Sequence, residues 1–457
     1  MVTADVEIGE LGQTQRLRGG VVEVAVLAYP AVLQTLSDTL MQVVDAAIVG
    51  RLGVTELGAV GFGGVWLWTL VVVFVGTGTG VQTFVAQEYG AGRHHTCGRW
   101  MWQGFYTAVP LAALWALCIG IFFPMLLALL GPSPALGALA TQYVHYRLFG
   151  IPALIANVVF IAFFRGCGDT RTPLIGTVVA NLLNVFLVYG LVFGRFGFPA
   201  WGVSGAGAAT AAANWTYLLI MLIALRRRRL RQTYATAICR PHWESIVRFA
   251  RTSIPVGGQW VLDMISFALF STIIVRMGDV QMAASQAMLQ LLSLSFMQAY
   301  GISIASGALV GRYVGARDLA AAERTHRSAL QLGMALAAIV AVLFVSVPET
   351  LLSLFSQEAS VLALARPLLV LGALFQLIDA MGIIAGGALR GAGDTRFPFV
   401  VQTLLAWLLR LPLVYTLAVV LGYRVTGAWL GELGYVTVLS TTWLLRFHRG
   451  AWRSIRI

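Results

Sequence analysis

The sequence predicts an all-α integral membrane protein with twelve transmembrane helices in two parallel six-helix repeats. One observation behind this prediction is composition: 58% of the 457 residues are hydrophobic and only 11% are charged, far from the balance of a soluble domain. The other is an internal repeat. Residues 165–173 read RGCGDTRTP, and residues 390–398, which lie 225 positions later, read RGAGDTRFP.

Apolar runs long enough to cross a bilayer recur along the whole chain. A membrane-spanning helix needs about 20 mainly apolar residues, and six segments in each half meet this requirement. They are 22–48, 57–84, 100–125, 136–162, 172–194 and 202–225, then 246–274, 281–308, 328–348, 361–387, 397–421 and 427–446. Six crossings return the chain to the side where it started, so both repeats are expected to share one orientation.

The offset of 225 residues pairs positions throughout the two halves without any insertion. The pairs are Pro30 with Pro255, Gln34 with Gln259, Asp38 with Asp263, Arg51 with Arg276, Gly53 with Gly278 and Gly90 with Gly315. We therefore expect two lobes of one ancestral design, residues 21–225 and 246–447. Because the repeat already supplies two lobes, a monomer is expected.

Three segments lie outside the lobes. Residues 1–20 are polar and contain acids, unlike a secretory signal, and are expected to form a cytoplasmic tail, as are residues 448–457. Residues 226–245 contain RRRRLRQ. This arginine-rich connector is interpreted either as a flexible hinge between the lobes or as a stop signal for the sixth span.

All 31 basic residues are arginines, and most fall in loops on one side of the predicted spans. The positive-inside rule makes that side cytoplasmic. We therefore expect a multi-pass protein of the cell (inner) membrane, embedded in the lipid bilayer, with both termini in the cytoplasm. The net charge of +12 is then a topology signal, and no nucleic-acid partner is expected.

Enzymatic classes are disfavoured. The chain has no lysine, so the phosphate-binding lysine of a Walker motif is absent. An intramembrane enzyme would need a nucleophile–base pair or clustered histidines at membrane depth, and the spans show neither. We expect no enzyme activity and no cofactor.

Ionisable side chains within spans indicate where function resides, because charge in the bilayer is costly and needs a reason. Those singled out are Asp38, Asp45, Asp263, Asp379, Arg410 and Glu432. Gln34, Asp38, Gln42 and Asp45 follow spacings of four, four and three, which places them on one helical face. The seventh span repeats part of this stripe as Gln259, Asp263 and Ser266.

Two such stripes predict an aqueous cleft lined by acids. Acids without matching bases favour cations, and protonation of a carboxylate in the membrane is a usable switch. The alternative interpretation is that each aspartate is neutral, hydrogen-bonded, and only holds helices together.

Several segments resemble a known family. VVDAAIVGRLG ends the first span, AQEYGAGR follows the second, RGxGDTR is duplicated, and GRFGFPAWGVSGAGAATAAANW joins the fifth and sixth spans. Over about residues 20–445, the chain is similar to multidrug and toxic compound extrusion (MATE) transporters. The resemblance implies two six-helix lobes around a central cavity. It also implies antiport of organic cations against sodium ions or protons.

The resemblance also implies roles for single residues. Asp45 matches a coupling-ion aspartate, accompanied by Asn184, and Asp379 matches the tenth-helix aspartate of the NorM-like branch. Asp263 stands where that branch has glutamate. Cation coupling is therefore expected at Asp45, Asp263, Asp379 and Asn184. A sodium ion at Asp263 and Asp379 would be the only metal.

Val188 stands where archaeal DinF-like members carry a second aspartate, which weakens the transfer of their proton site. Asp38 stands where the family often has glutamine. We infer that the repeat-related Asp38 and Asp263 frame the substrate cation, whereas Asp45 and Asp379 couple the ion. Further substrate contacts are predicted at Gln34, Gln42, Gln259, Gln286 and Trp260, which is the aromatic beside Asp263.

The remaining polar residues receive structural interpretations. Arg410 is expected to form a salt bridge with Asp379 or Glu432, or else to contact substrate. Gating and structural roles are expected for the duplicated loops, at Arg165, Asp169, Arg171, Arg390, Asp394 and Arg396. There each aspartate is positioned to cap the helix that follows or to neutralise neighbouring arginines.

The predicted function is secondary active export of small-molecule organic cations. We expect this export to be coupled to entry of sodium ions or protons and to proceed by rocker-type alternating access. The alternative is a flippase for lipid-linked sugars, whose cavity would be lined by arginine or lysine.

Overall fold

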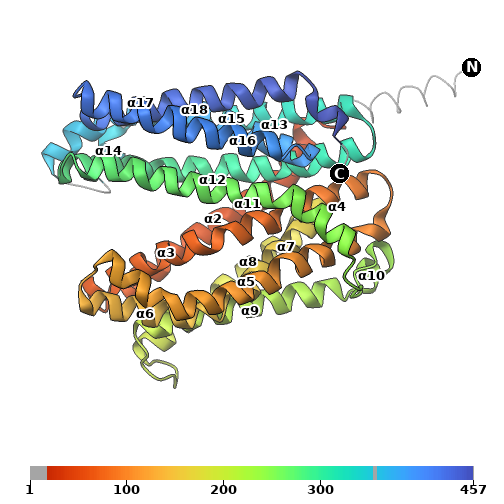
Figure 1. The fold of residues 1–457 in the computed structure, drawn as a ribbon, viewed down its shortest axis with the longest axis horizontal. Helices are drawn as coiled ribbons and strands as arrows, with labels where there is room; N and C mark the ends of the chain where they lie inside the picture. The colour runs from red at the N-terminus through yellow and green to blue at the C-terminus, as the bar shows by residue number, and fades with distance from the viewer. Residues whose placement is uncertain (1–17, 354–357, 456–457) are drawn as a thin grey trace, which may run out of the picture. The chain divides into compact units, whose positions relative to one another are not determined.

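The computed structural model describes residues 18–353 and 358–455, so most of the predicted tail 1–20 lies outside the described residues. All regular structure in the described residues is helical (Figure 1). The predicted all-α fold is confirmed.

The helices pack as two units whose boundaries repeat at the sequence offset. Unit 2 is Leu33–Gly257, and unit 1 is Met1–Val32 with Gly258–Ile457. Both boundaries fall inside long helices, α2 (Val21–Val49) and α11 (Trp243–Val275), two residues after their internal prolines. The packing units therefore differ from the predicted lobes, because the first part of each of these helices packs with the other half of the sequence.

Unit 2 contains the remainder of the first repeat. Its helices are α3 (Val54–Thr79), α4 (Val81–Gly90), α5 (His94–Leu130), α6 (Pro134–Leu148), α7 (Ile151–Gly166), α8 (Arg171–Phe193), α9 (Val203–Leu225) and α10 (Arg228–Tyr234). α3 and α4 form one apolar run, whereas α6 and α7 are bent by 51° relative to each other.

Unit 1 contains the remainder of the second repeat. Its helices are α12 (Asp279–Gly315), α13 (Leu319–Ser346), α14 (Pro348–Leu352), α15 (Ala359–Ala392), α16 (Arg396–Leu405), α17 (Leu411–Tyr415) and α18 (Arg424–His448). Two π-helical turns, η1 (Ala406–Arg410) and η2 (Thr416–Val420), flank α17, and a 3₁₀ turn, η3 (Ala451–Ser454), follows α18.

The predicted spans correspond to these helices in order. Within the described part of the chain, ten helices are long and apolar enough to cross a membrane, and the bent pair α6–α7 adds an eleventh. The twelfth predicted span, 427–446, is α18, whose 25 residues suffice in length, although its glycine, serine and threonine residues and Glu432 make it less apolar than the other spans. Several helices extend past the predicted ends, because the apolar pattern marks the bilayer crossing rather than the last helical hydrogen bond.

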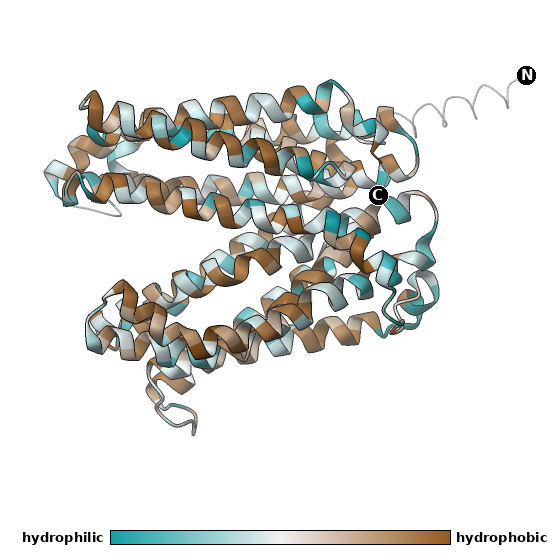
Figure 2. Cartoon of the chain, viewed as in Figure 1, coloured by the Kyte–Doolittle hydropathy of each residue, from teal (hydrophilic) through white to brown (hydrophobic). Residues whose placement is uncertain are grey.

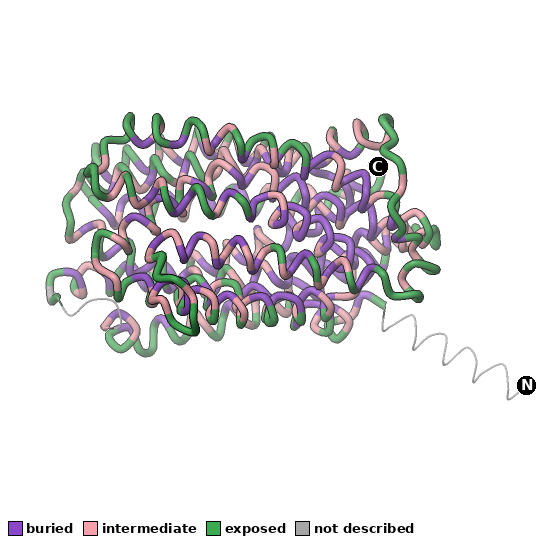
Figure 3. The backbone as a smooth tube through the Cα atoms, turned by 90° about the horizontal axis from the view of Figure 1, so that it is seen from below, coloured by how far each residue is buried: buried purple, intermediate pink, exposed green. Residues whose placement is uncertain are grey.

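Apolar side chains also cover the outside of the helices. On α5, Leu117, Ile121 and Met125 are 67%, 71% and 73% exposed. Figure 2 shows hydrophobic residues along every long helix, and Figure 3 shows exposed and buried positions alternating along them. Lipid is the solvent that such a surface requires.

Small residues allow helices to approach closely at equivalent places in both units. A Cβ on Gly391 of α15 would overlap the carbonyl oxygen of Gly307 in α12. At the equivalent place in unit 2, a Cβ on Gly166 of α7 would lie 3.0 Å from the carbonyl oxygen of Gln82 in α4. This is the small-residue packing typical of membrane helices.

The connector 226–245 is docked onto α5 rather than forming an isolated flexible hinge. Trp102 Nε1 donates to the carbonyl of Thr236 at 3.1 Å, and Tyr106 OH donates to that of Cys239 at 2.7 Å. Gln103 bonds both the Arg240 carbonyl and the His242 amide. The hinge interpretation is therefore corrected. Polar side chains of α5 supply partners for connector backbone groups, and sequence alone did not reveal this.

We expect Gly391→Ala to destabilise the purified protein by about 1–3 kcal/mol, because the methyl group meets fixed backbone rather than a movable side chain. Gly372→Ala on the same helix is the matched control, since its Cβ would meet the flexible Met288 side chain at 3.1 Å. Thermal unfolding in detergent measures both. Equal losses for the two variants would contradict the close-packing argument.

Candidate functional site

The polar residues of the spans gather in two clusters, one within each unit. The N-terminal cluster comprises Gln34, Asp38, Asp45, Arg165, Thr177, Asn181, Asn184 and Tyr217, all in unit 2. The C-terminal cluster comprises Asp263, Ser266, Asp379, Arg410, Glu432 and Tyr435, all in unit 1.

Asp45 is held by the amide of Asn184. Asn184 Nδ2 lies 3.2 and 3.3 Å from the two carboxylate oxygens of Asp45, and the asparagine is buried in α8. The structure thus brings together the two residues that the resemblance paired. A neutral donor orients Asp45 without itself cancelling the negative charge of the ionised carboxylate.

Asp38 lies seven residues before Asp45 on the same face of α2 and is exposed. Asn181 Nδ2 reaches Asp38 Oδ1 only at 3.5 Å, and it makes a shorter bond, 3.0 Å, to Ser37 Oγ. No ion pair involves Asp38 among the residues that the structure describes. Asp38 therefore retains a carboxylate that can receive a cation.

Gln34 is not on an accessible surface. Its side chain is 3% exposed, accepts a bond from Arg165 NH2 at 2.8 Å, and donates to Thr177 Oγ1 at 3.1 Å. Tyr217 OH continues this chain to the Pro173 carbonyl. We therefore assign Gln34 to packing within unit 2, in place of the predicted substrate contact.

Arg147 is a charged span residue that the sequence reasoning missed, although it stands inside the predicted span 136–162. In α6 its guanidinium bonds the Tyr143 hydroxyl and lies 5.5 Å from the centre of that ring. It interacts electrostatically with Asp45. The signal available in the sequence was simply an arginine in an apolar run.

Arg410 organises the C-terminal cluster. Its Nε lies 2.7 Å from Glu432 Oε2, and its NH1 lies 3.5 Å from Asp263 Oδ1 and 3.4 Å from Ser266 Oγ. Arg410 and Glu432 are 2% and 5% exposed, whereas the Asp263 side chain is 45% exposed. The expected pairing with Glu432 is confirmed. The contact with Asp263 was not predicted, and it shows that the expectation of acids without matching bases is wrong here.

A local break in the helix accompanies this arrangement. Arg410 is the last residue of η1, and Pro412 follows at the second position of α17. Proline has no N–H and its ring crowds the carbonyl four residues earlier, which favours a wider π turn. π-Helical turns often mark functional sites. Here the turn ends at a buried guanidinium.

Aromatic rings surround the same guanidinium. Its central carbon lies 5.5, 5.7 and 5.2 Å from the ring centres of Phe267, Phe270 and Tyr435. Such contacts stabilise a cation that has left water. Asp379 of α15 interacts electrostatically with Asp263, Arg410 and Glu432, so the cluster combines three acids with one base.

The other predicted substrate contacts divide into buried and accessible residues. Gln259 is 4% exposed and its amide donates to Gln402, so it packs within unit 1 and is corrected in the same way as Gln34. Trp260 packs edge-on against Tyr300, with ring centres 6.4 Å apart. Gln42 and Gln286 are exposed.

The duplicated loops do not use their aspartates alike. Asp169 accepts bonds from the backbone amides of Arg171 and Thr172 at 3.1 and 2.9 Å, so the predicted cap of α8 is confirmed. Asp394 instead bonds Arg446 of α18 at 2.9 Å, and α16 has no side-chain cap. Of the two roles predicted for Asp394, pairing with an arginine is therefore observed, with Arg446 as the partner, and capping of α16 is not.

The arginines of these loops also differ. Arg165 bonds Gln34, whereas Arg171 and Arg396 are exposed. Arg390 is half-buried.

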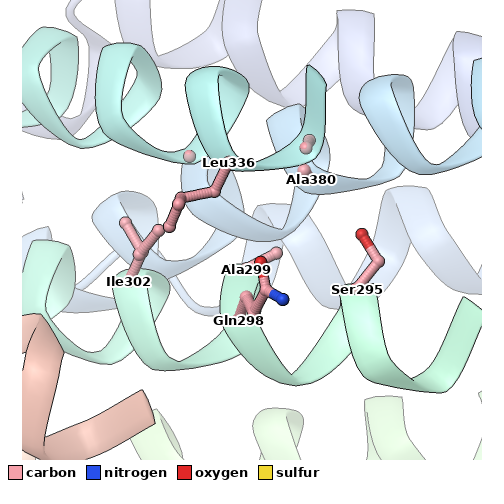
Figure 4. A pocket seen from close by; sticks show the side chains of 8 residues that line it. Ser295, Gln298, Ala299, Ile302, Leu336 and Ala380 are labelled. Carbon is pink, nitrogen blue, oxygen red and sulfur yellow. The ribbon is translucent and has the colours of Figure 1, made fainter. Parts of the chain in front are cut away.

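A small cavity lies between α12, α13 and α15, and no residue of the C-terminal cluster lines it. Figure 4 shows Ser295, Ala299 and Ile302 from α12 near Leu336 and Ala380. The cavity is too narrow to hold a water molecule. We regard it as loose packing. No group of three or more metal-ligating side chains suited to a metal ion is present in residues 18–353 and 358–455.

Comparisons with known proteins agree with the repeat. The family model described as MatE matches residues 30–190 and 255–416. A probable multidrug resistance protein NorM from Thermotoga maritima is 30% identical over 437 residues, covering 94% of this chain and 92% of the relative. A multidrug resistance protein MdtK from Yersinia pseudotuberculosis is 29% identical, covering 92% and 93%.

Solved structures show the same fold. The Vibrio cholerae MATE transporter VcmN in its bent form has a TM-score of 0.85 at 19% identity, over 95% of this chain and 97% of that one. A eukaryotic MATE transporter, AtDTX14, has a TM-score of 0.86 at 19% identity, over 94% and 96%.

We expect Glu432→Gln to destabilise the protein by on the order of 3 kcal/mol, because it leaves a buried arginine undercompensated. The charge-balanced double variant R410Q/E432Q should lose less. Thermal unfolding of both variants checks this. Glu323→Gln is the control, since its pair with Arg453 is half-exposed and should contribute less than about 1 kcal/mol. A double variant less stable than Glu432→Gln would contradict the argument.

Proposed function

Because the chain belongs to the MatE family, whose members are multi-pass membrane transporters and not enzymes, we propose that it exports cationic amphipathic compounds from the cell. Relatives called multidrug resistance proteins, at about 30% identity over most of the chain, support multidrug efflux. The finer proposal is antiport against sodium ions or protons across the inner membrane, by a monomer with both termini in the cytoplasm.

The exposed carboxylate of Asp38 is the observation that supports an organic cation as the substrate. It lies on a membrane helix, it is accessible, and only a weak amide contact at 3.5 Å holds it. An organic cation is the ligand that compensates such a charge, and the exposed Gln42 one turn later on α2 adds an uncharged polar contact. Trp260 offers an aromatic surface beside Asp263.

Coupling is assigned to Asp45 with Asn184 and to Asp379. A ligand shifts a conformational equilibrium only through its different affinities for the two states. A coupling cation that binds these acids favours release of the drug cation, because both respond to the same negative field. Rocker-type alternating access of the two repeats would convert this competition into export.

A lipid-linked sugar flippase remains the second candidate, because Arg147 and Arg410 place basic groups in the spans. Both are engaged, Arg147 by the Tyr143 hydroxyl and Arg410 by Glu432 and Asp263. An anionic lipid headgroup would have to displace these partners. This makes the cation exporter the better proposal.

We expect proteoliposomes containing the protein to export a fluorescent organic cation when a proton or a sodium gradient is imposed. Asp45→Asn and Asp379→Asn should each lower the rate by at least about tenfold, since a coupling charge is lost. Glu323→Gln, outside both clusters, is the control. Absence of export under both gradients would refute the proposal and favour the flippase.

We also expect Asp38→Asn to weaken binding of the same cation by about tenfold, because one uncompensated charge near a cation contributes roughly 1 kcal/mol or more. Asp38→Glu, which keeps the charge, should retain most of the affinity. Fluorescence titration of the purified protein gives both values. Equal affinities for wild type and Asp38→Asn would show that Asp38 does not bind the substrate.

A further inference from the structure

Arg410 contacts three of the oxygen atoms that a metal cation could use in the C-terminal cluster. Hard cations bind through several oxygen ligands, and in unit 1 such ligands would come from Asp263, Asp379 and neighbouring groups. Arg410 contacts Asp263 Oδ1 at 3.5 Å, Glu432 Oε2 at 2.7 Å and Ser266 Oγ at 3.4 Å. Three of the candidate oxygen atoms therefore face a guanidinium.

The guanidinium is not free to leave this position. It is 2% exposed, comes from the end of a π turn, and lies among three aromatic rings within 5.7 Å. Moving it away would leave the Glu432 carboxylate, which is 5% exposed, without its ion pair. Such a loss is strongly unfavourable. A small cation that enters the cluster consequently meets a fixed positive charge.

From this geometry we infer that Arg410 is a tethered cation that excludes sodium ions from the C-terminal carboxylate cluster. This inference deepens the proposed function and rests on it. It specifies that the C-terminal cluster of a cation-coupled exporter does not bind sodium ions. Arg410 is thus an ion-specificity residue that acts through charge and through occupancy of the acidic oxygens. The sodium site expected at Asp263 and Asp379 does not fit the residues present.

Unit 2 shows why the exclusion is local to unit 1. The repeat equivalent of Arg410 is Val185, and that of Glu432 is Gly207. A Cβ on Gly207 would lie 2.5 Å from the Tyr143 carbonyl oxygen, so a glutamate has no room there. The N-terminal cluster therefore lacks the buried ion pair.

The test compares the sodium response of wild type with that of R410Q/E432Q, which removes the internal cation and keeps the net charge. Thermal unfolding is followed in sodium chloride and in choline chloride at equal ionic strength. A ligand that binds only the folded state raises Tm with the logarithm of its concentration. We expect the double variant to gain about 2 °C for each tenfold increase in sodium above Kd. Wild type should gain less than the double variant, and Asp263→Asn should leave the sodium response of wild type unchanged.

Two further variants make the comparison specific. R446Q/D394N removes another ion pair of unit 1, in which the arginine is 29% and the aspartate 4% exposed, and should gain no sodium response despite its loss of stability. Adding Asp263→Asn to R410Q/E432Q should abolish the gain. Both controls separate an ion site from general destabilisation.

The inference is overturned if R410Q/E432Q responds to sodium no more than wild type does. It is also overturned if wild type shows a sodium response that Asp263→Asn removes, because sodium would then bind beside Arg410. Neither measurement requires transport, so failure of this inference is distinguishable from failure of the export proposal.

Discussion

A charged side chain inside the bilayer must be compensated by another group of the protein. In unit 1 the buried Arg410 and Glu432 compensate each other. The pair joins η1 to α18 through a bond of 2.7 Å. It draws in Asp263 from α11, and it is surrounded by rings of α11 and α18. Helices from three parts of the sequence are thereby oriented by one guanidinium, whose loss would affect packing and electrostatics together.

The two repeats share a scaffold but use different chemistry. Gln34 and Gln259, which are repeat equivalents, are both buried and both bond the fifth helix of their repeat, through Thr177 and Gln402. Asp38 and Asp263 are also equivalents, yet one contacts a neutral amide and the other an arginine. The hydrogen bonds of Gln34 and Gln259 to neighbouring helices are therefore the same in both repeats. The partners of Asp38 and Asp263 differ between the repeats.

Hydropathy, arginine placement and the 225-residue offset were enough to predict the helices and their repeated pairs. These features depend on local composition. The partners of the polar residues depend on how each helix is rotated, and the π turn before Pro412 changes that rotation in a way no apolar pattern encodes. The contact of Arg410 with Asp263, the burial of both glutamines, and the docking of the connector therefore required the structure. So did the division of α2 and α11 between units, because it follows from tertiary packing alone.

The asymmetry has a physical consequence for any cation that binds. In unit 2 the acids are held by asparagine amides, Asp45 by Asn184 and Asp38 by Asn181. A neutral donor orients a carboxylate without cancelling its charge, so an ion can arrive and leave while the donor stays in place. In unit 1 an arriving cation must compete with an arginine that cannot leave without exposing Glu432 to the cost of an unpaired buried charge. For the proposed exporter we therefore expect exchangeable cation binding in unit 2, whereas in unit 1 Arg410 offsets part of the acidic charge.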